Sequence, residues 1–302
     1  MADLTTRLCG LTLKNPVIAA SGTFGFGREY DQFYDIGRLG GVSVKGLTRL
    51  PRQGNPPCRI AETPSGMLNA VGLQNPGVEA FIADELPWLA AKGTCVIANV
   101  AGACEEDYVY MAERISQAPV DMVELNISCP NVKQGGVAFG TKPEMVLKIT
   151  QLARAACRHP LMVKLSPNTA SIRETALAAQ EGGADAISLI NTLTGMAIDI
   201  ERRRPVIHNV TGGLSGPAVR PVALRMVYEA AQAVSIPVVG MGGIQTGEDA
   251  VAFLLAGACA VQVGTANLSD PMACLKVIEG IDRYCDDHGF AAAAQLVGAL
   301  NV

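Results

Sequence analysis

Eight short runs of apolar residues rich in valine, isoleucine and alanine recur along the chain, and nearly all are continuous rather than alternating. Continuous runs of this length are typical of strands in a parallel sheet that is covered on both faces. The runs are PVIAAS (16–21), GVSVKG (41–46), CVIANV (95–100), MVELNIS (122–128), LMVKLS (161–166), AISLIN (186–191), PVVGMGG (237–243) and AVQVGTA (260–266).

Segments with helical spacing separate these runs. In 143–157, for example, apolar side chains recur every three or four residues and fall on one face of a helix. Capping signals mark several predicted helix starts: Thr141 with Glu144 and Ser171 with Glu174 fit the S/T-x-x-E box, Thr246 with Asp249 is a close variant, and Asp270 precedes a proline at the first helical position.

The alternation of eight strands with helices predicts one α/β domain over residues 1–302. A (β/α)₈ TIM barrel is favoured over an open doubly wound sheet. No linker or low-complexity tract interrupts the chain. Two longer connections, 47–77 and 192–217, are rich in glycine, proline and asparagine, and we interpret them as active-site excursions rather than domains.

Composition and charge narrow the function classes. Hydrophobic residues make up 49% of the 302 residues and aromatic residues only 5%, with 32 glycines, which suits many small-residue contacts and tight turns. The formal charge of −4 gives no basic surface for nucleic acid. No apolar run reaches the roughly 18 residues of a membrane span, and we expect a cytoplasmic protein.

The nine cysteines are odd in number and contain no C-x-x-C pair. The three histidines, His159, His208 and His288, lie far apart. These spacings argue against disulfides, zinc and iron–sulfur ligation within this chain, so we predict no metal site. A reduced compartment follows from the same spacing.

Polar residues end most of the predicted strands. In a parallel barrel these ends meet at one rim, which is where chemistry takes place. Each residue alone has an ordinary structural explanation, since a terminal asparagine often caps a turn and a lysine reaches solvent. Together they suit a flat hydrogen-bonding heterocycle, because amides both donate and accept in the plane of a ring. The group comprises Ser21, Lys45, Gly46, Asn99, Asn126, Cys129, Lys164, Asn191 and Thr192.

Glycines follow the last two predicted strands, in GMGGI (240–244) and VGTA (263–266). Barrels commonly hold phosphate at this position on bare backbone N–H groups. Tight turns also need glycine, so the signal is weak by itself. No G-x-G-x-x-G follows a strand, and a dinucleotide-binding unit is not predicted.

Long motifs over essentially the whole chain resemble the dihydroorotate dehydrogenase family, and within it the NAD-linked type B catalytic subunits. They include NPVIAASGTFGFG, SVKGLT, GMLNAVGLQNPG, NISCPNVKQGG, VKLSPN, LINTLTGMAID and NVTGGLSGPAVRP, together with the two glycine motifs. The resemblance implies a barrel that holds FMN and oxidises dihydroorotate to orotate in pyrimidine (UMP) biosynthesis. A local departure is Cys58, where the family leads us to expect proline.

The resemblance also implies residue roles. Cys129 is the expected base that takes the proton, and Lys164 the expected catalytic cation beside the flavin. The expected substrate-binding residues are Lys45, Asn69, Val71, Gly72, Leu73, Asn126, Asn131, Asn191 and Thr192. The expected FMN-binding residues are Ser21, Lys45, Gly46, Asn99, Asn126, Lys164, Ile190, Gly216, Gly242, Gly243, Gly264 and Thr265.

Type B enzymes pass electrons to a second subunit that carries FAD and an iron–sulfur (2Fe–2S) cluster and reduces NAD. The resemblance therefore implies such a partner, and a homodimer of this chain within a heterotetramer. Quinone-using relatives have an N-terminal extension and a serine as base, which this sequence does not show. Fumarate-using soluble relatives share the cysteine, so they stay an alternative.

Two alternatives from other classes stay open. Lys164 at a strand end beside a phosphate site also fits a Schiff-base lyase, because a desolvated lysine is a competent nucleophile. A barrel that binds its ligand without catalysis is the second.

Overall fold

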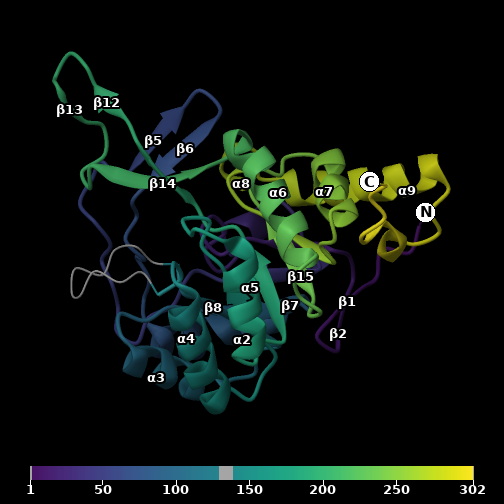
Figure 1. Cartoon of the computed structure of the whole chain (residues 1–302), viewed down its shortest axis with the longest axis horizontal. Helices are drawn as coiled ribbons and strands as arrows, with labels where there is room; N and C mark the ends of the chain where they lie inside the picture. Colours follow the sequence, from purple (N-terminus) through teal and green to yellow (C-terminus); the bar gives the residue numbers. More distant parts are fainter. Residues whose placement is uncertain (1, 129–138, 302) are drawn as a thin grey trace.

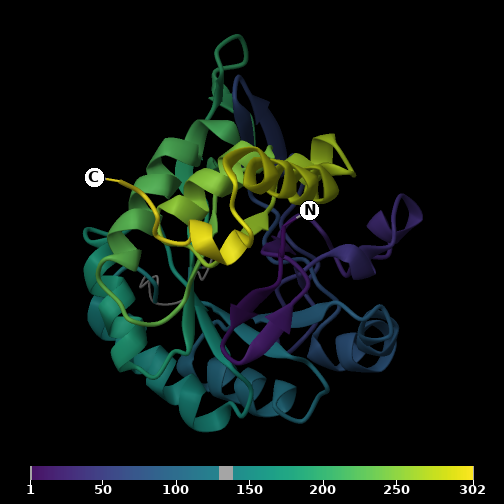
Figure 2. The same cartoon turned by 90° about the vertical axis from the view of Figure 1, so that its right-hand side faces the viewer.

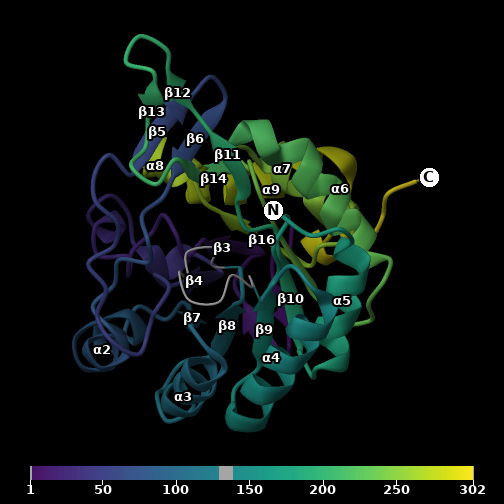
Figure 3. The ribbon, with the colours of Figure 1, turned by 60° about the vertical axis from the view of Figure 1, so that its left-hand side comes forward.

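The computed structural model describes residues 2–128 and 139–301. Eight parallel strands close into a barrel in the order β10-β15-β16-β3-β4-β7-β8-β9 (Figures 1 and 3). Each lies within one of the eight predicted runs, and the predicted (β/α)₈ TIM barrel is confirmed. The strands are β3 Val17–Ala19, β4 Gly41–Ser43, β7 Cys95–Val100, β8 Met122–Asn126, β9 Leu161–Lys164, β10 Ala186–Leu189, β15 Val238–Met241 and β16 Ala260–Val263.

Helices surround the barrel, and neighbours contact one another in the order α3, α4, α5, α6, α7, α9. No helix within 2–128 or 139–301 is both long and apolar enough to cross a membrane. The longer helices are α3 Glu105–Ile115, α4 Pro143–Ala156, α5 Ile172–Glu181, α6 Arg220–Ala231, α7 Gly247–Leu255 and α9 Ala273–His288. The short ones are α1 Val78–Ala80, α2 Leu86–Ala90 and α8 Ala266–Ser269, with a π-helical turn at Phe81–Glu85.

The continuous apolar runs are explained by burial on both strand faces. Along β8, Val123 and Leu125 belong to the apolar layer between barrel and helices, whereas Met122 belongs to a second cluster inside the barrel. Successive strand residues point to opposite faces, so Glu124 and Asn126 follow Met122 along the inner face. The interior of the barrel is therefore apolar at the amino ends of the strands and polar toward their carboxyl ends.

A hairpin covers the amino end of the barrel. It consists of β1 Thr6–Leu8 and β2 Leu11–Leu13, an antiparallel pair (Figure 2). Leu8 and Leu13 are buried in the inner cluster with side chains such as Ile18, Met162 and Val239. The sequence does not predict these strands, because runs of three residues are too short to show a period.

The two long connections pair with each other beyond the carboxyl ends of the barrel strands (Figure 1). They form an antiparallel sheet in the order β11-β14-β6-β5, and a further hairpin, β12–β13, extends from it. Both supply residues to the pocket described below, which agrees with their interpretation as active-site excursions. The strands are β5 Ile60–Thr63, β6 Gly66–Asn69, β11 Leu193–Met196, β12 Ile198–Asp199, β13 Arg204–Pro205 and β14 Thr211–Ser215.

Two of the four predicted caps are confirmed. Ser171 accepts the backbone N–H of Glu174, and Thr246 forms a reciprocal capping box with Asp249. The other two were placed wrongly. Helix α4 has Lys142 at its N-cap, one residue after Thr141, because Pro143 sets the first helical position. Helix α9 begins at Ala273, and Asp270 instead accepts the N–H of Met272 in a turn before the helix.

Candidate active site

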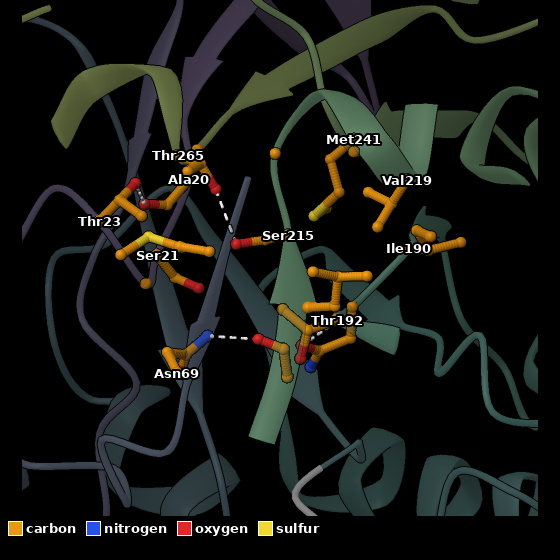
Figure 4. Close-up of a pocket in the computed structure, with 18 of the residues that line it drawn as sticks. Ala20, Ser21, Thr23, Asn69, Ile190, Thr192, Ser215, Val219, Met241 and Thr265 are labelled. Atoms are coloured by element: carbon orange, nitrogen blue, oxygen red, sulfur yellow. Dashed lines mark hydrogen bonds between the residues drawn. The ribbon is translucent and has the colours of Figure 1, made fainter. Parts of the chain in front are cut away.

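A pocket of about 360 Å³ opens at the carboxyl ends of the barrel strands. It lies beneath the antiparallel sheet, and Figure 4 shows residues from both the barrel loops and this sheet around it. Its volume is in the range of small-molecule and cofactor sites. Apart from Cys129 and Asn131, which lie outside the described residues, it is lined by every residue predicted for the site: Ser21, Lys45, Gly46, Asn69, Val71, Gly72, Leu73, Asn99, Asn126, Lys164, Ile190, Asn191, Thr192, Gly216, Gly242, Gly243, Gly264 and Thr265.

Three neighbouring strands supply the polar floor of this pocket. Asn126 at the end of β8 lies opposite Lys164 of β9, and Asn99 of β7 lies opposite Glu124. Asn99 is fully buried, and Asn126 and Lys164 are nearly so. Buried polar groups need partners, so these side chains must be satisfied by one another or by a ligand.

Glu124, which was not among the predicted site residues, is the central partner of these side chains. Its side chain is fully buried within the barrel. Oε1 accepts hydrogen bonds from Ser188 and Gln262, each at 2.7 Å. Oε2 accepts from Ser43 at 2.7 Å and from the Asn99 amide at 2.6 Å. The carboxylate is thus bound by donors from four other barrel strands.

The charge of Glu124 is stabilised despite its burial. Burial by itself raises the pKa of Glu124, but the Lys164 ammonium and the hydrogen bonds from Ser43, Ser188 and Asn99 outweigh it. The pKa of the carboxyl therefore lies below its ordinary value. One signal could have found this residue: it is the one charged residue within the strand-like run MVELNIS, and a buried charge implies a partner.

Side-chain amides continue from Glu124 along the floor of the pocket. The Asn126 Nδ2 group donates to Asn99 Oδ1 at 3.4 Å, and Asn191 Nδ2 donates to Asn126 Oδ1 at 3.3 Å. Asn126 Oδ1 also accepts the backbone N–H of Ser128 at 3.3 Å. Asn191 Oδ1 in turn accepts the N–H of Thr192 at 2.8 Å. The predicted amides are therefore one connected chain rather than separate strand ends.

The sheet formed by the two excursions is the second wall of the pocket. Asn69 on β6 donates to the carbonyl of Gly213 on β14 at 3.3 Å, which ties the two excursions together (Figure 4). The Thr265 hydroxyl after β16 donates to Ser215 Oγ at 2.9 Å (Figure 4). This second contact joins the sheet to the loop that follows the last barrel strand.

The glycines after β15 and β16 have different roles. Gly243 has a φ of +75°, and a Cβ there would lie 2.7 Å from the carbonyl oxygen of Gly216, so the backbone itself requires glycine. A Cβ at Gly264 would lie no closer than 3.6 Å to the atoms around it. Gly264 therefore has room for a Cβ atom, and what it leaves open is a backbone surface facing the pocket.

The cysteines within 2–128 and 139–301 are all free thiols. Burial raises the pKa of Cys95 and Cys274 to about 12 and that of Cys259 to about 11. These three thiols stay protonated near neutral pH and act as small hydrophobic side chains. None of the three lines the pocket.

A closed parallel barrel that gathers polar side chains and glycine loops at the carboxyl ends of its strands has the architecture of a (β/α)₈ enzyme. The family model described as dihydroorotate dehydrogenase matches residues 3–284. The chain belongs to the dihydroorotate dehydrogenase family. Family membership decides against the Schiff-base lyase and the non-catalytic barrel.

Curated relatives cover nearly the full chain. "Dihydroorotate dehydrogenase B (NAD(+)), catalytic subunit" of Alkaliphilus oremlandii is 56% identical over 298 residues, 99% of each chain. The proteins of the same name from Geotalea uraniireducens and Geobacillus kaustophilus are 53% and 54% identical, over 99% of this chain and 98% and 96% of theirs. A solved structure of dihydroorotate dehydrogenase from Eimeria tenella, in complex with ferulenol, is similar in fold, with a TM-score of 0.81 and 22% identity over 98% of this chain and 88% of that chain.

We predict that Glu124 makes the free energy of unfolding of the apo-protein fall as the pH is lowered into the acid range. Its folded-state pKa is lowered from the ordinary 4.5, so the ionised carboxylate contributes stability above pH 4.5 that is lost as the pH falls through the folded-state pKa. Urea unfolding from pH 7 to pH 3 should show a shallower acid decline in the free energy of unfolding for Glu124→Gln than for wild type. Glu181→Gln, at an exposed position at the end of α5, is the matched control. Parallel curves for wild type and Glu124→Gln would contradict the prediction.

Proposed function

We propose that this chain is an FMN-containing catalytic subunit that oxidises dihydroorotate to orotate in de novo pyrimidine biosynthesis. One observation carries the proposal. In a chain of this family, the predicted site residues within the described part all line one pocket, whose floor offers amides and a cation and whose far end offers glycine loops. NAD is the proposed final acceptor, because the curated relatives carry NAD(+) in their names.

The volume of the pocket lies in the range of cofactor sites, and the chemistry of its lining suits FMN. Gly264 leaves bare backbone in reach of a phosphate, beside Thr265 and Gly243. Lys164 and Asn99 on the floor supply a positive charge and an amide edge for the flavin ring. Bound FMN would accept the hydride that dihydroorotate loses. The proposed FMN-binding residues are Ser21, Lys45, Gly46, Asn99, Asn126, Lys164, Ile190, Gly216, Gly242, Gly243, Gly264 and Thr265.

The substrate would lie between the amide floor and the sheet formed by the excursions. Lys45 supplies the positive charge for the substrate carboxylate, and Asn126 and Asn191 orient the ring by hydrogen bonds. Asn69 and Thr192 approach from the excursions. The proposed substrate-binding residues are Lys45, Asn69, Val71, Gly72, Leu73, Asn126, Asn131, Asn191 and Thr192.

Cys129 is the proposed base. Forming the ring double bond removes a hydride from one carbon and a proton from its neighbour, and a side chain must take the proton. A thiol with an ordinary pKa of about 8.5 provides some thiolate near neutrality, which a serine hydroxyl does not. Ser128, which directly precedes Cys129, lines the pocket and donates its hydroxyl to the carbonyl of Lys164 at 3.1 Å.

The electron route is proposed to run through a partner. The relatives are named as catalytic subunits, and we propose a second subunit with FAD and a 2Fe–2S cluster that reduces NAD. We further propose a homodimer of this chain within a heterotetramer, in the cytoplasm, with residues 1–302 as one FMN-binding domain. Transfer of electrons to fumarate is the alternative, and the assay for NADH formation by the isolated chain distinguishes the two routes.

We predict that Cys129→Ser slows flavin reduction by dihydroorotate at pH 7 by roughly 10²- to 10⁴-fold, the usual contribution of a general base. The rate should recover as pH rises, because the hydroxyl loses its proton only at much higher pH. FMN content and orotate binding should stay within about twofold of wild type. Stopped-flow absorbance of the flavin measures the rate, and Cys104→Ser, at an exposed cysteine outside the pocket, is the control. An unchanged rate in the Cys129→Ser protein at pH 7 would remove Cys129 as the base.

Gly264 provides the test of the phosphate site. Alanine and then valine at this position should lower FMN content stepwise, because the added side chain takes the space of the phosphate while the fold tolerates it. Thermal unfolding of the apo-proteins should stay close to wild type. Gly243→Val is unsuitable for this purpose, since its Cβ would clash with the backbone. Full flavin content in Gly264→Val would contradict the assignment.

We predict that the isolated chain reduces its FMN with dihydroorotate and passes electrons to an artificial dye, yet forms negligible NADH. The sequence contains no dinucleotide fingerprint and no C-x-x-C spacing for a cluster. NADH absorbance should appear only after the partner subunit is added. Rapid NADH formation by this chain alone would refute the two-subunit route. Brisk turnover with fumarate would favour the other soluble type.

A further inference from the structure

The hydrogen-bond chain on the floor of the pocket begins at a group that can only accept. An ionised carboxylate has no proton to donate, so each neighbour of Glu124 must present a donor to it. Asn99 meets this requirement with its Nδ2 group at 2.6 Å from Glu124 Oε2. Its other end, Oδ1, is thereby turned away from Glu124 and toward the pocket.

This orientation is passed on from one amide to the next. Because Asn99 presents Oδ1, Asn126 must present Nδ2 to it, and Asn126 Oδ1 is then free to accept from Asn191 Nδ2. An amide that turned over would place two donors or two acceptors against each other. The charge of Glu124 therefore sets the direction of the chain at Asn99, and the backbone N–H groups of Ser128 and Thr192, which Asn126 Oδ1 and Asn191 Oδ1 accept, support the same direction at the next two amides.

Glu124 also balances the charge of Lys164. Lys164 is nearly buried on β9, the strand paired with β8, and its positive charge helps to hold Glu124 ionised. Lys164 lines the pocket, whereas Glu124 lies beneath it and does not. A negative charge at this depth, in a medium of low dielectric, acts on any redox group bound above it.

We propose that Glu124 is a positioning residue of the flavin site, whose buried negative charge fixes the direction of the Asn99–Asn126–Asn191 chain and offsets the positive charge of Lys164. The proposal rests on the proposed function for its ligands, FMN and orotate. Glu124 touches neither ligand, and it acts through Asn99 and Lys164.

The neighbours of Glu124 can accommodate glutamine, which removes the charge and keeps the volume. Gln262 Oε1 is buried and has no hydrogen-bond partner among the residues that the structure describes. Turning the Gln262 amide over would let this oxygen accept from a glutamine at position 124, and the Ser188 hydroxyl can rotate to accept as well. Glu124→Gln should therefore fold.

The first experiment measures the midpoint potential of FMN bound to the wild-type chain and to Glu124→Gln. Loss of a buried negative charge should strengthen binding of reduced FMN relative to oxidised FMN by about tenfold. For a two-electron couple this corresponds to a shift of about 30 mV to more positive potential. Orotate binding, followed by the flavin spectrum, should weaken about three- to tenfold, because a neutral acceptor orients Asn99 less strongly. Ser188→Ala removes one hydrogen bond but keeps the charge. It should change neither the relative affinity for reduced and oxidised FMN nor the affinity for orotate by more than about twofold.

A double variant that exchanges the two side chains distinguishes the effect of the charge from the effect of packing. In Glu124→Gln/Gln262→Glu, the carboxylate moves to the neighbouring side chain, 2.7 Å away across the existing hydrogen bond. The potential should return toward wild type in this double variant. A purely structural role predicts that the second substitution only adds damage. An unchanged potential and orotate affinity in Glu124→Gln, or no rescue in the double variant, would overturn the proposal.

Two further measurements keep the outcome decisive. If Glu124→Gln does not fold, Glu124→Asp keeps the charge but shortens its reach, so the potential should stay near wild type while orotate binding weakens. Unchanged orotate binding would contradict the proposal.

If the wild-type chain takes up no FMN, the proposed function fails, and the amide chain is tested in the apo-protein. With ¹⁵N-labelled asparagine, Glu124→Gln should shift the side-chain amide signals of Asn126 and Asn191 and Ser188→Ala should not. Unmoved signals would refute the amide chain.

Discussion

The buried carboxylate of Glu124 is the constraint on which the rest of the barrel interior depends. Its four hydrogen bonds come from Ser43 on β4, Asn99 on β7, Ser188 on β10 and Gln262 on β16. A strand that slipped by one residue would turn its donor out of the barrel and leave a buried charge poorly paired, which is costly. The network therefore specifies the register of strands that are far apart in the sequence. It also explains why the barrel changes from apolar to polar within one layer of side chains.

The pocket above this layer is built from two parts with different architecture. The floor belongs to the barrel, whose strands are held by parallel pairing on both sides. The opposite wall belongs to the excursions, which are tied to each other by Asn69 and to the barrel loops by Thr265. A polar floor that is fixed by a buried charge gives a ligand a defined set of donors and acceptors before it binds. Such preorganisation lowers the cost of ordering side chains on binding.

The sequence predicted the barrel and, among the described residues, the side chains that line one pocket, and it failed where local signals were short or ambiguous. Eight continuous apolar runs are a strong signal because parallel strands are buried on both faces. The β1–β2 hairpin has strands of three residues, and β14 contains two glycines, so neither shows a strand pattern. Glu124 was passed over because its run as a whole is apolar, and only the structure shows that four distant donors converge on it. The start of α4 was misplaced because a proline competed with the capping box.

Burial makes three of the described cysteines unsuitable as bases. Cys95, Cys259 and Cys274 are held by burial with pKa values of about 11 to 12, so they cannot serve as bases near neutral pH. The proposed base follows Ser128, whose N–H is bound by Asn126 Oδ1. Asn126 is oriented by Asn99, and Asn99 by Glu124. The charge at the centre of the barrel is thus connected, through two amides and one backbone N–H, to the residue that directly precedes the proposed base. The same chain of contacts that satisfies a buried carboxylate therefore also holds the backbone N–H of Ser128, the residue before the proposed base.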